Sequence, residues 1–153
     1  MEFYQNILEK LSNRMIRYIR NDLNMSKITN DFVIKEVDLM NYKDITSLIS
    51  LSGEKAGTIG LSVSSKFAKK MVKKFIFGEI DQSSLDELAS ENVSETLNII
   101  LGNILDEEEV KNINISTPHT LHNKVTITKK KNGRIFFSKL KYEEEEIILS
   151  YFI

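Results

Sequence analysis

A long amphipathic helix, predicted over residues 86–103, places the strongest constraint on how this 153-residue chain can fold. Large apolar residues recur along it at the helical spacing of about 3.6 residues: Val93, Leu97, Ile100, Leu101 and Ile104. At roughly 100° per residue these side chains form one stripe along the helix. Because a helix buries such a stripe against other elements, we expect this helix to belong to the core.

The opposite side of the same helix carries a narrow strip made of Glu91, Glu95, Asn98 and Gly102. A glycine on an exposed helix face costs up to about 1 kcal/mol relative to alanine. Gly102 therefore indicates that something approaches the helix closely at this point. The pattern Glu-x-x-Asn is short, and most of its instances are ordinary solvated helix faces. Other features of the sequence are needed to distinguish a binding surface from an ordinary solvated helix face.

Length and charge restrict the class of protein. One domain is predicted over residues 1–153, large enough to bury roughly two-thirds of its unfolded surface. The net charge of −1, from 21 basic and 22 acidic residues, indicates neither a nucleic acid nor a membrane surface as partner. Three lysine clusters, at 69–70, 73–74 and 129–131, are interpreted as solvated faces, because no aromatic platform accompanies them.

The chain has no cysteine, which excludes disulfides, thiolate catalysis and the usual structural zinc site. Its first residues lack the basic start and apolar run of a signal peptide. No segment approaches the roughly 20 apolar residues that cross a bilayer. We therefore expect a soluble protein of the cytoplasm.

Hydrophobic spacing predicts three helices. The first covers residues 3–24, and the second covers 66–75, with Ser64 or Ser65 as its cap and Gly78 as its end. The third is the long helix already described, for which Ser83 or Ser84 is the predicted cap.

Alternating apolar residues and turn signals predict the strands. A phase change at Lys35-Glu36, within a strand over 32–40, is interpreted as a bulge. An Asn132-Gly133 pair is typical of a hairpin turn. The predicted strands are 32–40, 45–51, 58–63, 112–116, 124–130, 134–141 and 146–152, with hairpins joining 45–51 to 58–63 and 124–130 to 134–141. This order of elements predicts an α+β fold with a largely antiparallel sheet packed with helices.

Few residues offer covalent or metal chemistry. His119 and His122 are the only histidines, and no Asp or Glu lies close to them in sequence, so we interpret them as loop residues rather than ligands. No serine-nucleophile elbow, Walker motif or dinucleotide fingerprint is present. Glu95 and Asn98 fit a different mechanism, because an amide can orient an attacking water and phosphoryl hydrolysis needs mainly positioning and charge stabilisation.

With these motifs, the sequence resembles the CheX branch of the CheC/CheX/FliY phosphatases, which act on phosphorylated CheY-type response regulators. The segment 94–103, Ser-Glu-Thr-Leu-Asn-Ile-Ile-Leu-Gly-Asn, is similar to the Glu-x-x-Asn helix of that family. The segment 51–61 resembles the glycine-bearing hairpin of the family, and 115–118 resembles its short strand and proline. A single Glu-x-x-Asn helix is typical of CheX, whereas CheC carries a pair.

The resemblance implies a CheC/CheX-like fold and a role for each residue of the strip. Asn98 would align water against the aspartyl phosphate, and Glu95 would pair with the active-site lysine of the regulator. Glu91, Ser94 and Gly102 are predicted to bind the partner. Mg²⁺ would belong to the receiver domain, so no cofactor is expected on this chain, and a homodimer is implied.

Three departures from the family pattern keep other functions open. The first helix lacks the usual Asn-Pro start, residues 106–109 are acidic within a short connection, and the loop after Pro118 has no glycine. A non-catalytic CheX/CheC-like interaction module, binding a receiver domain or a motor component, is the alternative. An unrelated α+β domain with a coincidental Glu-x-x-Asn is the third possibility.

We predict that the chain itself needs no metal or organic cofactor, because it lacks cysteine and any phosphate-cradling motif. Metal analysis of the purified protein should find no stoichiometric metal, and any Mg²⁺ requirement should depend on the regulator. Retained metal with His119 or His122 as a ligand would contradict this prediction.

Overall fold

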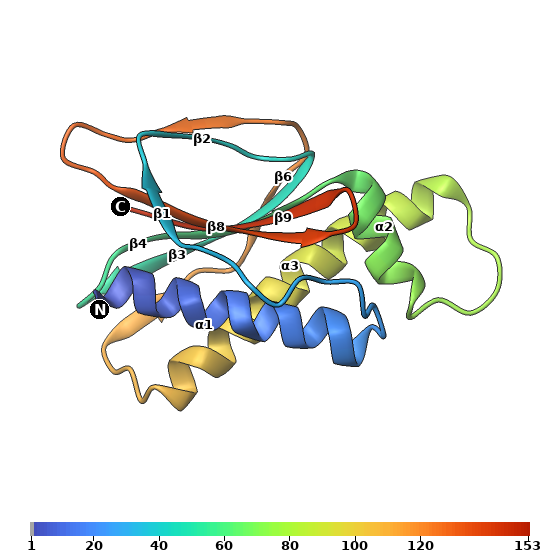
Figure 1. Ribbon diagram of the computed structural model, residues 1–153, viewed down its shortest axis with the longest axis horizontal. Helices are drawn as coiled ribbons and strands as arrows, with labels where there is room; N and C mark the ends of the chain where they lie inside the picture. Colours follow the sequence, from blue (N-terminus) through green and yellow to red (C-terminus); the bar gives the residue numbers. More distant parts are fainter. Residues whose placement is uncertain (1) are drawn as a thin grey trace.

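The computed structural model describes residues 2–153 and has three layers (Figure 1). A seven-stranded antiparallel sheet forms the middle layer. Helices α1 (Phe3–Arg17) and α3 (Gln82–Glu107) cover one face of it, and a two-stranded ribbon covers the other. The shorter helix α2 (Ser65–Lys73) packs against α3 at one end of the sheet. This arrangement confirms the predicted α+β fold.

The main sheet has the order β1-β8-β9-β4-β3-β5, and β6 also pairs with β3. The ribbon consists of β2 and β7. The strands are β1 (Lys35–Val37), β2 (Leu39–Asn41), β3 (Ile45–Gly53), β4 (Gly57–Val63), β5 (Ile113–Ile115), β6 (His119–Leu121), β7 (Thr126–Thr128), β8 (Ile135–Tyr142) and β9 (Glu145–Phe152).

The apolar stripe of α3 lies in the core, as the spacing predicts. Val93, Leu97 and Leu101 are each at most 1% exposed, and α3 packs on β3 and β4. The first predicted helix is present as α1, which continues into a π-helical turn (Tyr18–Asp22) where the Leu23 N–H donates to the Tyr18 carbonyl at 3.1 Å. Both long helices therefore turn their apolar sides to the same face of the sheet.

The predicted hairpin of β3 and β4 is confirmed, with a register that runs from Ile45 opposite Val63 to Leu51 opposite Gly57. Gly57 has a φ of +136°, and a Cβ at this position would lie 2.4 Å from Cε1 of Tyr151. Glycine is needed there both for the backbone conformation and for the close packing of Tyr151.

The predicted bulge within residues 32–40 is wrong. The chain forms two short strands in different sheets, because β1 pairs with β8 whereas β2 pairs with β7. The Lys129 N–H donates to the carbonyl of Asp38, the residue between them, at 2.9 Å. The phase change at Lys35-Glu36 therefore accompanies a crossing from the main sheet to the ribbon.

The predicted hairpin of 124–130 with 134–141 is also wrong, although its turn is present. The Gly133 N–H donates to the Lys130 carbonyl at 2.9 Å. Both edges of β8 are already paired, with β1 and β9, so β7 has no edge of β8 to join and pairs with β2 instead. A Cβ on Gly133 would lie 2.4 Å from the carbonyl oxygen of Ile153, so glycine permits close approach of the C-terminal backbone.

Two of the predicted helix ends differ from the structure. Ser64 does cap α2, accepting from the Phe67 N–H at 3.0 Å, but α2 ends at Lys73, before the loop that contains Gly78. The cap of α3 is Asp81 instead of Ser83 or Ser84. Its carboxylate accepts from the Ser84 N–H at 2.8 Å and from the Ser84 hydroxyl at 3.1 Å. A carboxylate one turn earlier thus satisfies the first free N–H groups of the helix.

We expect Asp81→Ala to lower the thermal midpoint of unfolding by about 2–4 °C, the usual effect of losing one cap in a domain of this size. The Ser84 N–H and hydroxyl hold the pKa of the Asp81 carboxyl below its usual range. The stabilisation is therefore present above the unfolded-state pKa and is lost as the pH falls through the lower folded-state pKa. The thermal midpoints of the wild type and of Asp81→Ala should therefore approach each other as the pH falls. Calorimetry of both proteins across the acid range measures this difference.

Ser83→Ala is the matched control, because Ser83 is exposed and the Asp81 cap does not use its side chain. Its midpoint should equal that of the wild type. An equal loss in both variants would contradict the assignment of Asp81 as the cap.

Candidate functional site

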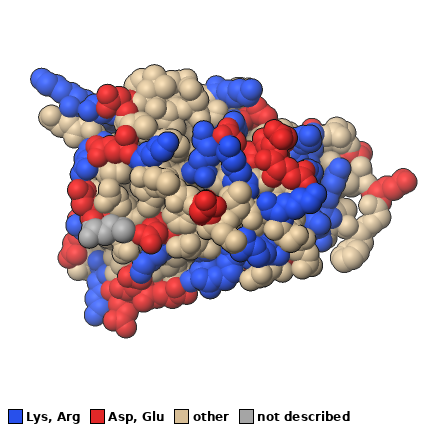
Figure 2. Space-filling model, in the orientation of Figure 1, with Lys and Arg blue, Asp and Glu red and all other residues tan. Residues whose placement is uncertain are grey.

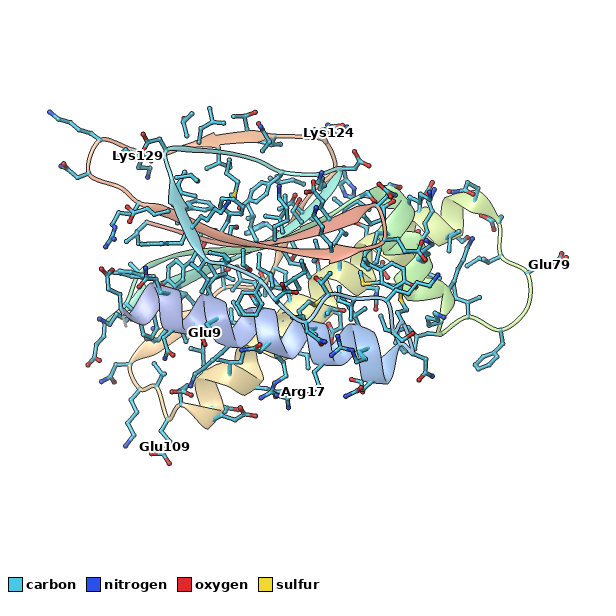
Figure 3. All side chains as sticks on the ribbon, viewed as in Figure 1. Glu9, Arg17, Glu79, Glu109, Lys124 and Lys129 are labelled. Carbon is cyan, nitrogen blue, oxygen red and sulfur yellow. The ribbon has the colours of Figure 1, made fainter. Side chains whose placement is uncertain are left out.

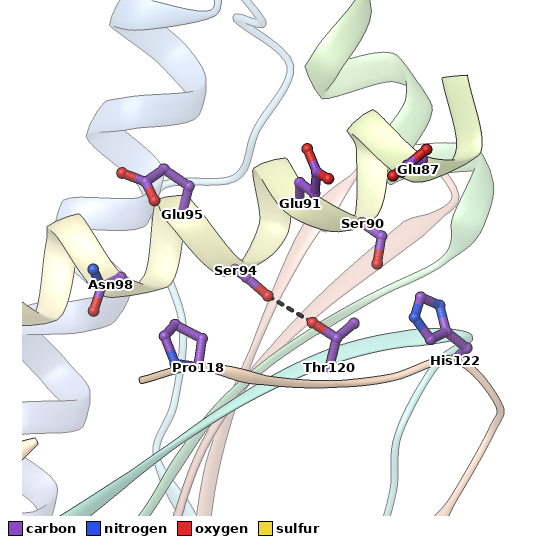
Figure 4. A pocket seen from close by; sticks show the side chains of 9 residues that line it. All are labelled: Glu87, Ser90, Glu91, Ser94, Glu95, Asn98, Pro118, Thr120 and His122. Carbon is purple, nitrogen blue, oxygen red and sulfur yellow. Dashed lines mark hydrogen bonds between the residues drawn. The ribbon is translucent and has the colours of Figure 1, made fainter. Parts of the chain in front are cut away.

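A pocket of about 490 Å³ lies along α3, where the helix faces the segment that leads into and out of β6 (Figure 4). The helix contributes one wall of the pocket, and Pro118, Thr120 and His122 contribute the opposite wall. The residues from α3 are Glu87, Ser90, Glu91, Ser94, Glu95 and Asn98. Four of the five residues that the sequence places in the site therefore line one hollow.

Gly102, the fifth predicted site residue, is not part of the pocket wall. It lies one turn beyond Asn98 on α3, and a Cβ at this position would have no neighbouring heavy atom within 4 Å. The surface of the helix is thus open at Gly102, so a partner could contact the backbone there.

A side-chain hydrogen bond holds the two walls together. The hydroxyls of Ser94 and Thr120 share a hydrogen bond of 2.8 Å (Figure 4). Thr120 is fixed in turn by the pairing of β6 with β3, in which it lies opposite Ser47. Ser94 is therefore tied to the sheet in this structure, although its resemblance-based role was partner binding.

Glu95 and Asn98 occupy the same exposed side of α3 because the apolar stripe takes the opposite side. Glu95 is exposed and Asn98 is half-buried. Neither side chain forms a hydrogen bond or ion pair with residues 2–153. The carboxylate and the amide thus take no part in holding the fold, and both are available to an incoming molecule (Figure 4).

The pocket wall on α3 is acidic. Glu87, Glu91 and Glu95 follow one another at intervals of four residues, and all three are exposed. None of them forms an ion pair within the described chain. On the face drawn in Figure 2, by contrast, basic and acidic side chains are mixed. The acidic row therefore favours a cationic group on whatever binds at the pocket.

Five residues of the pocket were not among the site residues predicted from the sequence: Glu87, Ser90, Pro118, Thr120 and His122. Glu87 could have been found, because it lies one turn before Glu91. Ser90 is only 8% exposed, and its hydroxyl faces the pocket (Figure 4). Pro118, Thr120 and His122 belong to β6 and the residues beside it, far from α3 in the sequence, so no helical spacing indicates them.

Within residues 2–153 no three His, Cys, Asp or Glu side chains come together in a group that could hold a metal ion. His122 lines the pocket, whereas His119 is an exposed residue of β6. No helix in the described part of the chain is long and apolar enough to cross a membrane.

Several solved structures have the same fold, and the similarity to each covers nearly the whole chain. CheX from Desulfovibrio desulfuricans has 18% identity and a TM-score of 0.70, with 95% of this chain and 97% of that chain covered. A CheC-like superfamily protein from Shewanella sp. PV-4 has 18% identity and a TM-score of 0.73, with coverage of 100% and 99%. The CheX-CheY-BeF3-Mg²⁺ complex from Borrelia burgdorferi contributes a chain with 18% identity, a TM-score of 0.72 and coverage of 97% and 96%.

No curated protein matches the sequence. The family model described as "Chemotaxis phosphatase CheX" matches residues 45–141, which is more than half of the chain and includes Glu95 and Asn98. The predicted resemblance is thereby confirmed, and the chain belongs to the CheX family of chemotaxis phosphatases.

Proposed function

We propose that this protein hydrolyses the aspartyl phosphate of a CheY-type response regulator, with Asn98 and Glu95 as the residues that act on it. The observation that carries the proposal is that these two side chains lie at the pocket and are free to bind another molecule. They lie one turn apart on the exposed side of α3, in the wall of the pocket, and neither forms a hydrogen bond with another residue of the described range 2–153. Family membership gives the reaction class.

In this mechanism Asn98 orients the attacking water. Its side chain has a carbonyl that accepts a hydrogen bond and an amino group that donates one. A water held by the amide attacks phosphorus in line with the acyl phosphate oxygen, the P–O bond to the aspartate breaks, and inorganic phosphate leaves. Positioning of this kind supplies much of the rate enhancement in phosphoryl transfer.

Glu95 orients the regulator in this mechanism. Its carboxylate pairs with a cationic side chain beside the phosphorylated aspartate, which fixes the phosphate relative to Asn98. Mg²⁺ is assigned to the receiver domain, where it neutralises charge on the phosphate. The side chains around the pocket offer no cluster of metal ligands, so every step assigned to this chain is one of binding or orientation.

A CheY-type partner is supported by one of the structures with the same fold, which joins CheX with CheY. The acidic row on α3 also favours a partner with positive charge near its phosphorylation site. The proposal places the reaction in the cytoplasm.

Asn98→Ala should reduce hydrolysis by one or more orders of magnitude while the complex still forms, because it removes the water-orienting amide and little contact area. A tenfold loss corresponds to about 1.4 kcal/mol in the barrier. Glu95→Ala or Glu95→Lys should instead weaken binding by on the order of 2–5 kcal/mol, much of it from the unpaired cation left on the partner. Decay of the phosphorylated regulator, measured beside equilibrium binding, separates the two effects.

Neither substitution should unfold the protein, because both positions are on the solvent side of α3. Leu97→Asp, which places a carboxylate at a position 1% exposed, should unfold it. If Asn98→Ala keeps full activity, this helix is not the active site, and the non-catalytic interaction module becomes the better proposal.

We also expect a homodimer that pairs through sheet edges and leaves both α3 helices free. The sequence suggested residues 124–141 as an edge, but β8 is paired on both sides. The outer strands β1, β5 and β6 and the ribbon therefore offer edges for pairing. Light scattering should give twice the chain mass at micromolar concentration. A monomer throughout that range would contradict the prediction.

A further inference from the structure

A second hollow lies on the side of Glu95 that faces away from Asn98. It has a volume of about 320 Å³ and is formed where α2 ends, where α1 becomes π-helical, and along the middle of α3. Its walls include Tyr18, Phe75, Asn92, Thr96 and Ile99. Burial raises the pKa of the Tyr18 phenol, so this wall is uncharged at neutral pH. Apart from Glu95 at its edge, the hollow has no ionised group.

Large apolar side chains around this hollow remain exposed. Phe75 is 53% exposed and Ile99 is 50% exposed, although both line the same cavity. The loop that follows Phe75 extends away from the body of the molecule, with Glu79 near its outer end (Figure 3), and it carries Phe77, which is 96% exposed. Single exposed apolar residues are common, but two that share a cavity mark a place where another surface can be buried.

One buried hydrogen-bond donor beside this apolar surface has no acceptor in the described part of the chain. Nδ2 of Asn92 is buried and has no hydrogen-bond partner among residues 2–153. A buried donor without an acceptor is unfavourable, so such atoms usually have a partner in the functional state. Asn92 lines the hollow, so a rotation of its buried amide toward a molecule bound there would give this donor an acceptor.

Glu95 joins this hollow to the pocket that contains Asn98, because its side chain lines both. At about 100° per residue, Ile99 is displaced by about 40° from Glu95 around the helix, and Asn98 by about 60° in the other direction. Ile99 therefore lies next to Glu95 on the side away from Asn98, so a surface that binds at Glu95 is adjacent to Ile99.

We propose that the hollow is the anchoring pocket for an apolar side chain of the response regulator, a side chain that lies beside the cation paired with Glu95. This inference rests on the proposed function and specifies the chemistry of its partner. The regulator presents an apolar group to Phe75 and Ile99, with a backbone carbonyl that accepts from Asn92. Anchoring contributes to affinity and to the choice of regulator, whereas Asn98 alone acts on the water.

Phe75→Ala and Ile99→Ala test the anchor in the full chain. Each should raise KM for a phosphorylated CheY-type regulator, and Kd for the complex, by about tenfold, with kcat changed less than twofold. Asn92→Leu should raise KM as well, and it should raise the thermal midpoint of the free protein, because the unpaired donor is removed. Val33→Ala is the matched control for loss of exposed apolar area, since Val33 is 68% exposed and lines neither hollow.

The outcomes separate this inference from the proposed function. If Phe75→Ala and Ile99→Ala leave KM and Kd unchanged while Asn98→Ala abolishes turnover, the anchor is wrong and the phosphatase stands. If the wild type binds the regulator without hydrolysing it and Ile99→Ala weakens that binding, the phosphatase is wrong and the anchor stands. If either alanine variant instead changes the oligomeric state, the hollow binds a second copy of this chain, and the anchor is overturned.

Discussion

The burial of the α3 stripe against β3 and β4 determines the rotation of the helix, and the rest of the site depends on that rotation. Val93, Leu97 and Leu101 are almost fully buried, and each contributes about 1.5–3 kcal/mol by leaving water. A rotation by one residue would expose part of this stripe and move a carboxylate of the acidic row toward the core, where an unpaired charge is very costly. Glu95 and Asn98 therefore face outward because the apolar residues cannot.

Periodicity made this part of the site predictable from the sequence. A helix has a single repeat, so the stripe on one side fixes which residues lie on the other, and Glu91, Glu95 and Asn98 followed from it. Thr120 and His122 could not be predicted in the same way, because their place in the pocket depends on the pairing of β6 with β3. The prediction of the α3 cap was wrong for a local reason. Asp81 and Ser83 are both residue types that cap helices well, and only the backbone geometry selects Asp81.

Strand pairing was the least predictable part of the fold. The Asn132-Gly133 turn was correctly recognised, yet β7 and β8 separate after it, because β8 is already paired on both sides. Turn chemistry acts over four residues, whereas the choice of partner is a competition among all strands of the sheet. The shape of the pocket depends on strand pairing as well. The Ser94–Thr120 hydrogen bond joins α3 to β6, and the position of β6 is determined by the whole sheet.

In the proposed function, the two hollows beside Glu95 separate recognition of the regulator from the chemical step. Contacts made equally in the bound complex and in the transition state improve binding without increasing the rate of the chemical step. The proposed apolar contacts at Phe75 and Ile99 are of this kind, because both residues line the hollow that does not contain Asn98. In the proposed mechanism, a water aligned by Asn98 contributes only when the phosphoryl group reacts. The proposal therefore assigns recognition of the regulator to one hollow and orientation of the water to the other.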